Sequence, residues 1–208
     1  MVTILIGKSA SGKDTLLHEL KEKHGFGDIV TTTSRPIREG EEEGVQYNFV
    51  SREQFMEKIN NNELLEYRTY NTLVNGKADT WYYGCPKSAA DKLDPNKDYV
   101  AIFDVQGAKD FVNYYGKDNC FVCYIDVNDT IRQRRAMNRG SFDQTEWTRR
   151  VIDDRKKFDW DNMKGLVNCV MANNSESLEF LTNRFLDKYS KYQKHIDLIK
   201  EENNDIER

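Results

Sequence analysis

Short apolar runs alternate with amphipathic stretches over much of the chain. The run 2–6 is β-branched and ends at Gly7, which predicts a buried parallel strand. Leucines at helical spacing then predict a helix over 13–23. Further apolar runs predict strands at 28–33, 99–103, 121–125 and 166–171, and a long helix is expected at 178–199. Because strands that alternate with helices favour a parallel sheet covered on both faces, we expect an α/β core.

A more polar region between residues 34 and 87 interrupts this alternation. Residues 45–50 alternate apolar and polar positions and predict a half-exposed strand. Ser51 and Gln54 have capping-box spacing at the start of a predicted helix. Two short strands are expected at 63–70 and 81–84. The region is therefore interpreted as an insertion on the core.

The whole chain, 1–208, is predicted to form a single domain in which two segments, an insertion and a lid, extend from the core. The core comprises about 1–33, 88–138 and 159–208, and the insertion about 34–87. A basic helix is expected at 129–138. The segment of about 139–158 is polar and poor in apolar residues, so we expect a mobile lid.

Composition and charge limit the classes of function. With 31 basic and 35 acidic residues, the formal net charge is −4, which disfavours non-specific nucleic-acid binding. Apolar runs are too short to cross a bilayer and no signal peptide is recognised, so a cytoplasmic protein is expected. Cys85, Cys120, Cys123 and Cys169 are predicted to be free thiols. Cys120 and Cys123 should face opposite sides of one strand.

The strongest local motif lies between the first strand and the first helix. It consists of Gly7, Lys8, Ser9, Ala10, Ser11, Gly12, Lys13, Asp14 and Thr15. In such a loop, backbone N–H groups surround phosphate oxygens and Lys13 reaches the β and γ phosphates, so ATP binding is predicted. Asp14 stands where a Ser or Thr usually ligates Mg²⁺. We expect Asp14 to face the metal or its waters and Thr15 to contact a phosphate, and we predict both as Mg²⁺ ligands.

Later blocks of the sequence carry a resemblance to a known family. They are Arg-Pro-Ile-Arg from residue 35, Gly-Glu at 40–41, Tyr-Asn-Phe-Val-Ser at 47–51, Glu-Leu-Leu-Glu-Tyr at 63–67, Tyr-Tyr-Gly at 82–84, Phe-Asp-Val-Gln-Gly at 103–107 and Arg-x-x-x-Arg-Gly at 135–140. In this order, the blocks resemble guanylate kinases over roughly residues 1–175. The resemblance implies a P-loop three-layer parallel sheet core with an inserted mixed α+β NMP-binding subdomain and a helical lid. It also implies Mg²⁺-assisted phosphoryl transfer from ATP to GMP or dGMP.

The resemblance assigns an acceptor site within the inserted region and beside it. Its GMP-binding residues are Thr31, Arg35, Arg38, Tyr47, Glu66, Tyr83, Cys85 and Asp104. Forked guanidinium groups suit a phosphate dianion, and one carboxylate can accept from the N1–H and amine of guanine. The chain departs from the family at Cys85, where a Ser is usual, and at Ile102, which replaces the first acid of an Asp-x-Asp pattern. Its 71–81 loop is also longer.

Phosphoryl transfer requires cations between two anions. The resemblance assigns Lys13, Arg135, Arg139 and Arg150 to this role, whereas Arg149 has no counterpart and is expected to be solvated. Alternatively, Arg132, Arg134 and Arg135 form a surface helix face or a nucleic-acid patch, which the acidic balance disfavours.

The sequence also leaves open two functions other than GMP phosphorylation. One is a kinase for a different or modified nucleoside monophosphate, suggested by Cys85, Ile102 and the 71–81 loop. The other is a non-catalytic module that binds phosphopeptides, which the intact loop around Lys13 disfavours. The expected partners are the nucleotides alone, with no nucleic acid or membrane. Either a monomer or a homodimer is expected.

Overall fold

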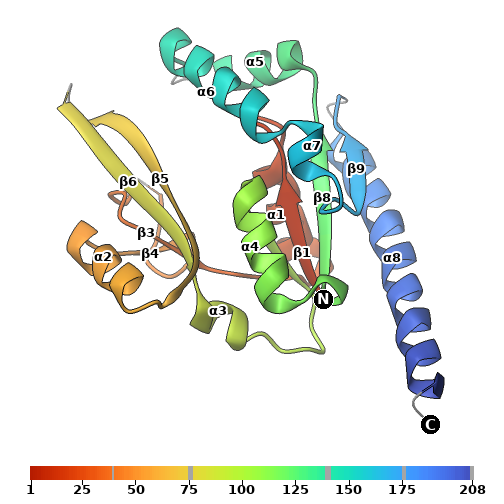
Figure 1. Ribbon diagram of the computed structural model, residues 1–208. Coiled ribbons are helices and arrows are strands. Elements are labelled where there is room, and N and C mark those ends of the chain that lie inside the picture. Colours follow the sequence, from red (N-terminus) through yellow and green to blue (C-terminus); the bar gives the residue numbers. More distant parts are fainter. Residues whose placement is uncertain (39, 75–76, 139–141, 175–176, 207–208) are drawn as a thin grey trace.

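The computed structural model describes residues 1–38, 40–74, 77–138, 142–174 and 177–206. Two separate sheets form the framework, one in the core and one beside it (Figure 1). The strands are β1 (Val2–Ile6), β2 (Gly27–Asp28), β3 (Thr31–Thr33), β4 (Tyr47–Phe49), β5 (Leu64–Val74), β6 (Lys77–Pro86), β7 (Tyr99–Ile102), β8 (Cys120–Asp126) and β9 (Cys169–Ala172). The helices are α1 (Lys13–His24), α2 (Arg52–Asn60), α3 (Lys87–Asp91), α4 (Val105–Tyr115), the short 3₁₀ helix η1 (Lys117–Asn119), α5 (Asp129–Met137), α6 (Gln144–Lys157), α7 (Trp160–Met163) and α8 (Leu178–Ile206).

The core sheet has the strand order β2-β7-β1-β8-β9, and all its paired strands are parallel. Every residue of the central strand β1 is buried, as an apolar strand covered on both faces requires. Leu16 and Leu20 of α1 and Phe185 of α8 pack on one face, whereas Phe111 of α4 packs on the other. The predicted parallel core is confirmed, and Cys120 and Cys123 do belong to opposite faces.

The second sheet has the order β4-β3-β6-β5 and lies beside the core (Figure 1). The prediction of one strand over 28–33 is wrong, because Gly27–Asp28 pairs with β7 whereas Thr31–Thr33 pairs with β4 and β6. The predicted short strands at 63–70 and 81–84 are in fact the longer β5 and β6. Their ladder continues from Glu66 opposite Cys85 out to Val74 opposite Lys77. The outer part of this hairpin, residues 71–74 and 77–80, mixes polar and apolar residues without a regular alternation, so its hydrophobic pattern did not show the true length.

Two other elements differ from the prediction. The last core strand begins at Cys169 instead of residue 166, because the Leu166 N–H bonds back to the Met163 carbonyl in a turn that closes α7. Helix α4 was not predicted from the sequence. Asp104 is its N-cap and accepts a hydrogen bond from the Gly107 N–H at 2.9 Å.

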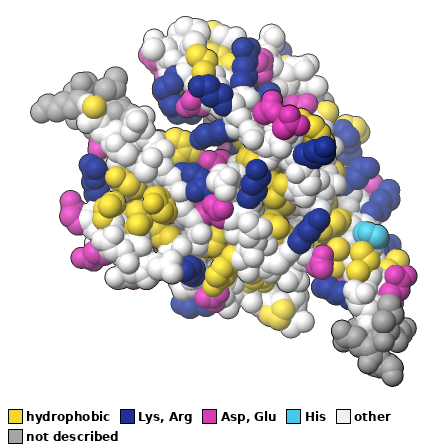
Figure 2. Space-filling view, in the orientation of Figure 1, with side chains coloured by type: hydrophobic (Ala, Val, Ile, Leu, Met, Phe, Trp, Pro, Cys, Tyr) yellow, Lys and Arg dark blue, Asp and Glu magenta, His cyan; other side chains and the backbone are white. Residues whose placement is uncertain are grey.

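Helix α6 occupies most of the predicted lid. It is less solvated than its polar sequence suggested, since Trp147 and Asp154 are buried. Basic and acidic side chains intermingle over α5 and α6 in Figure 2. Among the described residues, no helix combines the length and apolar character needed to cross a membrane.

Candidate active site

A cavity of about 450 Å³ lies where the loop after β1, the second sheet and helix α6 meet. Each of the three contributes several side chains to its wall. From the loop come Gly7, Ser9, Ala10, Lys13 and Asp14; from the second sheet and its loops come Thr31, Arg38, Tyr47, Glu66, Arg68, Tyr70 and Tyr83; from α6 come Glu146, Arg149, Arg150, Asp153, Asp154 and Lys157. Ile102 and Asp104 line it from the end of β7. The cavity thus joins some residues of the predicted donor site to some of the predicted acceptor site.

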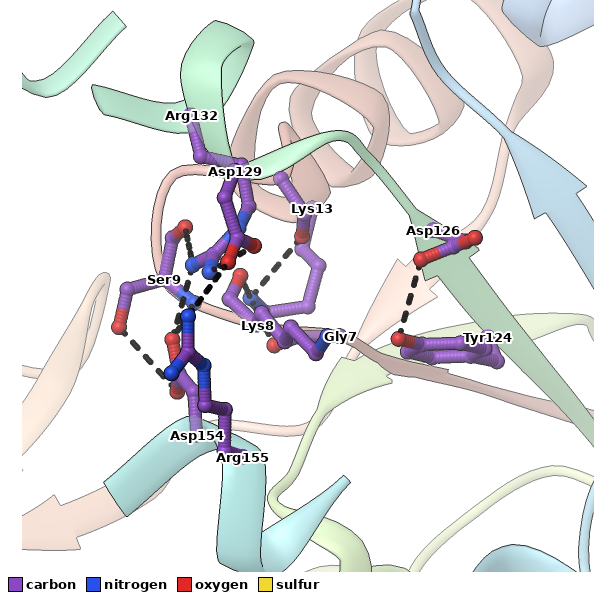
Figure 3. A network of polar contacts seen from close by, with 11 residues as sticks. Gly7, Lys8, Ser9, Lys13, Tyr124, Asp126, Asp129, Arg132, Asp154 and Arg155 are labelled. Carbon is purple, nitrogen blue, oxygen red and sulfur yellow. Dashed lines mark hydrogen bonds and ion pairs between the residues drawn. The ribbon is translucent and has the colours of Figure 1, made fainter. Parts of the chain in front are cut away.

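The loop at 7–13 wraps around the Lys13 side chain (Figure 3). Lys13 Nζ donates to the carbonyl oxygens of Gly7 at 2.7 Å and Lys8 at 3.1 Å. Gly12 is the N-cap of α1 with a φ of 95°, and a Cβ there would lie 2.7 Å from Asn173 Nδ2. Glycine is therefore required at the turn that aims the first N–H groups of α1 toward the cavity.

Asp14 is exposed and lines the cavity, whereas Thr15 is exposed and lies outside the lining. Asp14 and Tyr47 line the same cavity, and the pKa of Tyr47 is raised mainly by burial, then by Tyr83 and to a smaller extent by the negative charge of Asp14. No group of three or more His, Cys, Asp or Glu side chains that could hold a metal exists among the described residues. Mg²⁺ is commonly held by one or two carboxylates together with substrate phosphates and water. Asp14 fits such a site as one carboxylate ligand.

A buried ion pair ties α5 and α6 to the loop (Figure 3). Asp154 accepts from the Ser9 N–H at 2.8 Å and from Arg132 Nη1 at 2.9 Å. Arg132 also donates to the Ser9 carbonyl at 2.8 Å and to Asp129 at 2.8 Å, and none of its surface is exposed. The alternative that Arg132 belongs to a surface face or nucleic-acid patch is therefore wrong. Because Ser9 and Asp154 are 145 residues apart, no local pattern could indicate their contact.

The other predicted arginines differ in whether they line the cavity. Arg135 donates to Ser11 O at 3.4 Å and to Asn173 O at 3.1 Å, beside the loop but outside the cavity lining. Arg149 and Arg150 both line the cavity and both bond Glu146, whose pKa falls to about 2, chiefly through the Arg149 hydrogen bond. Arg149 therefore takes a position on the wall that the sequence did not suggest. Arg139 lies outside the described residues.

On the acceptor side, the structure brings Thr31, Arg38, Tyr47 and Tyr83 to the wall but not Arg35. The Tyr47 and Tyr83 rings meet edge to face at 5.8 Å. Arg35 is only 3% exposed and makes a forked pair with Glu41 at 2.8 and 2.9 Å. Arg35 thus holds the turn that carries Arg38, whose N–H also bonds Glu41 at 2.8 Å.

Glu66 lies at the inner end of the acceptor side and is 8% exposed. Burial raises its pKa to about 7; the Arg68 charge lowers it, and Asp104 and Asp110 raise it. A Cβ on Gly107 would lie 3.1 Å from Glu66 Oε2, so this glycine makes room for the carboxylate. Cys85 is fully buried and does not line the cavity. Its Sγ donates to Pro86 O at 3.7 Å, and burial raises its pKa to about 12.

Arg68 is a cavity residue that the sequence analysis missed. It contacts three carboxylates, with Nε 3.3 Å from Asp104, Nη2 2.8 Å from Asp110 and Nη1 3.6 Å from Glu66. The alternation of side chains along a strand could have indicated it, because Glu66, Arg68 and Tyr70 are two residues apart and all line the cavity.

The parallel core sheet, the loop that surrounds Lys13, the inserted second sheet and the helix over the cavity together define a P-loop nucleoside-monophosphate-kinase fold. A crystal structure of guanylate kinase from Anaplasma phagocytophilum matches this fold with a TM-score of 0.59 at 22% identity, covering 93% of this chain and 86% of that one.

Sequence comparisons narrow the class to one family. The family model described as guanylate kinase matches residues 1–81. A guanylate kinase from Helicobacter hepaticus is 34% identical over 144 residues, covering 68% of each chain. One from Clostridium tetani is 34% identical over 142 residues, covering 68% of this chain. This chain belongs to the guanylate kinase family. It spans 64% of the length of the Clostridium tetani protein.

Proposed function

We propose that the protein transfers the γ-phosphoryl group of ATP to GMP or dGMP. The observation that carries the proposal is that one cavity is lined both by the loop of Lys13 and by Glu66 with Tyr47 and Tyr83. A donor triphosphate at the loop and an acceptor at the second sheet would therefore meet without an intermediate carrier. The family to which the chain belongs supports the same pair of substrates.

In the proposed step, a phosphate oxygen of the acceptor attacks the γ phosphorus of ATP. A new P–O bond forms, the bond from γ phosphorus to the bridging β–γ oxygen breaks, and ADP leaves with that electron pair. Lys13 is placed to neutralise charge on the donor phosphates, and Arg149 and Arg150 approach from α6. Mg²⁺, when bound, supplies additional positive charge at the donor phosphates, with Asp14 as the protein's ligand. Asp154 holds α6 to Ser9, which excludes water from this side.

The acceptor is held at both ends. Arg38, Tyr47 and Tyr83 supply donors for the 5′ phosphate, and Thr31 adds a hydroxyl group. Ionised Glu66 accepts from the N1–H and the amine of guanine. Arg35 and Glu41 support the site by fixing the turn before the second sheet.

The division of the chain follows from these roles. Residues of about 34–87 serve as the acceptor-binding part, about 139–158 as the lid, and the remainder as the core. Because β3 (Thr31–Thr33) pairs with β4 in the second sheet, we propose that the acceptor-binding part begins at about residue 31.

A coupled assay that offers GMP, dGMP, AMP, UMP and dTMP with ATP and Mg²⁺ tests the proposal. We expect ADP formation with GMP and dGMP and little with the other acceptors. A preference for a non-guanine acceptor would instead identify a kinase of different base choice. The absence of turnover with every acceptor, while the nucleotides still bind, would favour a binding module.

A further inference from the structure

The Arg68 side chain lies beside the carboxylate that the proposed function assigns to the base. Glu66 and Arg68 project from the same strand, β5, and both line the cavity. The Arg68 Nη1 to Glu66 Oε2 distance is 3.6 Å, so a cationic donor and an anionic acceptor stand next to each other on one wall. The Arg68 side chain is 24% exposed, which leaves part of the guanidinium open to the cavity.

The contacts of Arg68 hold it in place without using all of its donors. Nε donates to Asp104 at 3.3 Å, Nη2 to Asp110 at 2.8 Å and Nη1 to the Tyr67 carbonyl. A guanidinium has five N–H groups, so beyond these three bonds one N–H group remains on each of Nη1 and Nη2, and Nη1 is also the nitrogen that lies 3.6 Å from Glu66 Oε2. Asp104 is the N-cap of α4 and Asp110 lies in the middle of the same helix, and together they fix the guanidinium plane relative to Glu66.

Cys85 does not supply a donor to this part of the cavity. It is fully buried, its Sγ points to Pro86 O, and it is absent from the cavity wall. A base that enters beside Glu66 therefore meets the guanidinium of Arg68 in preference to the thiol.

We propose that Arg68 is a specificity-determining residue that donates to the six-position oxygen of the acceptor base while Glu66 accepts from the neighbouring N1–H and amine. This inference rests on the proposed function. The two side chains together are complementary to an edge with one acceptor followed by two donors, which is the edge that guanine presents. Two parallel hydrogen bonds to adjacent base atoms require a donor and an acceptor side by side, as Arg68 and Glu66 are.

The same pair rejects adenine. Its six-position amine would face the Arg68 donors, and its N1 lone pair would face the Glu66 carboxylate. One contact places donor against donor and the other places acceptor against acceptor. Because the buried polar groups are then left unpaired, the site should discriminate strongly against adenine. Arg68 also favours the ionised, doubly accepting form of Glu66, since its positive charge lowers the Glu66 pKa against the effect of burial.

The test compares GMP with 6-thio-GMP, in which a weakly accepting sulfur replaces the six-position oxygen and N1–H and the amine are kept. We expect the wild-type kcat/KM to be roughly tenfold to hundredfold higher for GMP, because a charged donor loses its acceptor in the analogue. In Arg68→Met the two substrates should differ by less than about threefold. The ratio cancels any loss common to both substrates, such as a shift in Glu66 ionisation or a small movement of α4.

Arg52→Met is the matched control. Arg52 is an exposed arginine of α2 that stacks on Tyr82, and it does not line the cavity. Its substitution should leave the wild-type ratio unchanged. Arg68→Lys keeps the charge without the fork and should give an intermediate ratio.

The outcomes separate the inference from the function. If wild type phosphorylates GMP and 6-thio-GMP equally well, or if Arg68→Met lowers both equally and preserves the ratio, the inference is overturned and the proposed function stands. If wild type phosphorylates neither, the proposed function fails. If Arg68→Met does not fold, the ratio of kcat/KM for GMP and 6-thio-GMP in the wild type still tests the inference.

Discussion

At the donor end of the cleft, the cations Lys13 and Arg132 are held by oxygen atoms of the protein itself, whereas at the acceptor end three carboxylates gather around one arginine. Lys13 is bonded to the carbonyls of its own loop, and Arg132 is enclosed by Asp129, Asp154 and Ser9. At the acceptor end, Glu66, Asp104 and Asp110 gather around Arg68, with Lys157 Nζ 3.6 Å from Asp104.

The difference agrees with what each end is proposed to bind. Every nucleoside triphosphate has the same phosphate tail, so a rigid loop of backbone donors can be built in advance. A base edge must be distinguished from others, and this requires side chains whose charge and direction are specific. The raised pKa of Glu66 is the cost of placing such a carboxylate in a buried pocket.

The largest expected effect comes from removing the donor-end cation. In Lys13→Met, the γ phosphate loses a positioned charge, so kcat should fall about a thousandfold. GMP affinity should change by less than about threefold, because the acceptor residues are on another sheet. Steady-state kinetics and calorimetric titration with GMP measure the two quantities. Turnover retained within tenfold would contradict the role of Lys13.

Breaking the buried pair at the donor end should lower stability. In Asp154→Ala, fully buried Arg132 loses one partner and the Ser9 N–H loses its acceptor, which should cost about 3 kcal/mol in urea unfolding. Asp187→Ala, which removes an exposed pair with Lys191 on α8, is the control and should cost under about 0.5 kcal/mol.

The double variant Arg132→Met with Asp154→Leu sharpens this test. Apolar side chains remove both charges from the buried site, so much of the lost stability should return. Equal losses in Asp154→Ala and in the control would show that the network contributes little to the fold.

Glu66→Gln should lower kcat/KM for GMP about a hundredfold, since one acceptor becomes a donor. Steady-state kinetics with GMP measure this ratio.

The pH dependence of kcat/KM tests the same carboxylate. Below its pKa of about 7, Glu66 is protonated and accepts less well, so wild-type kcat/KM for GMP should rise as the pH increases through 7. The Glu66 carboxylate faces four groups that influence its pKa, namely Arg68, Asp104, Asp110 and the Cys85 N–H. In Glu66→Gln, the only remaining pH dependence of kcat/KM should come from the second ionisation of the GMP phosphate, near about pH 6. An unchanged profile would exclude Glu66 as the titrating group.

Cys85→Ser should have the smallest effect. The side chain is enclosed and bonds Pro86 O, and a hydroxyl can make the same bond, so KM for GMP should change by less than about threefold. A gain in GMP affinity of tenfold or more would show that residue 85 contacts the base, contrary to its position in the structure.

Local patterns predicted the parts of the molecule whose determinants are contiguous. The loop from Gly7 to Lys13 follows from spacing between a strand and a helix, and the buried core strands follow from apolar runs. The split between β2 and β3 was missed, because the continuous stretch 27–33 has no signal that assigns its halves to different sheets.

Side-chain partners were harder to predict than elements. Arg35 and Glu41 are six residues apart, yet a loop has no periodicity that fixes which way Arg35 points. The Ser9 contact with Asp154 depends on how α6 folds back over the loop, which is a tertiary effect. Strand alternation could have placed Arg68 beside Glu66, whereas its contacts with Asp104 and Asp110 of the α4 region depend on tertiary packing.

A crystal structure with a bisubstrate compound, adenosine joined to guanosine through their 5′ phosphates, would show whether donor and acceptor bind in one cavity. We expect the phosphate chain between Lys13 and Arg38, with the guanine edge against Glu66 and Arg68. Guanine density outside this cavity, or a base that contacts neither side chain, would contradict this expectation.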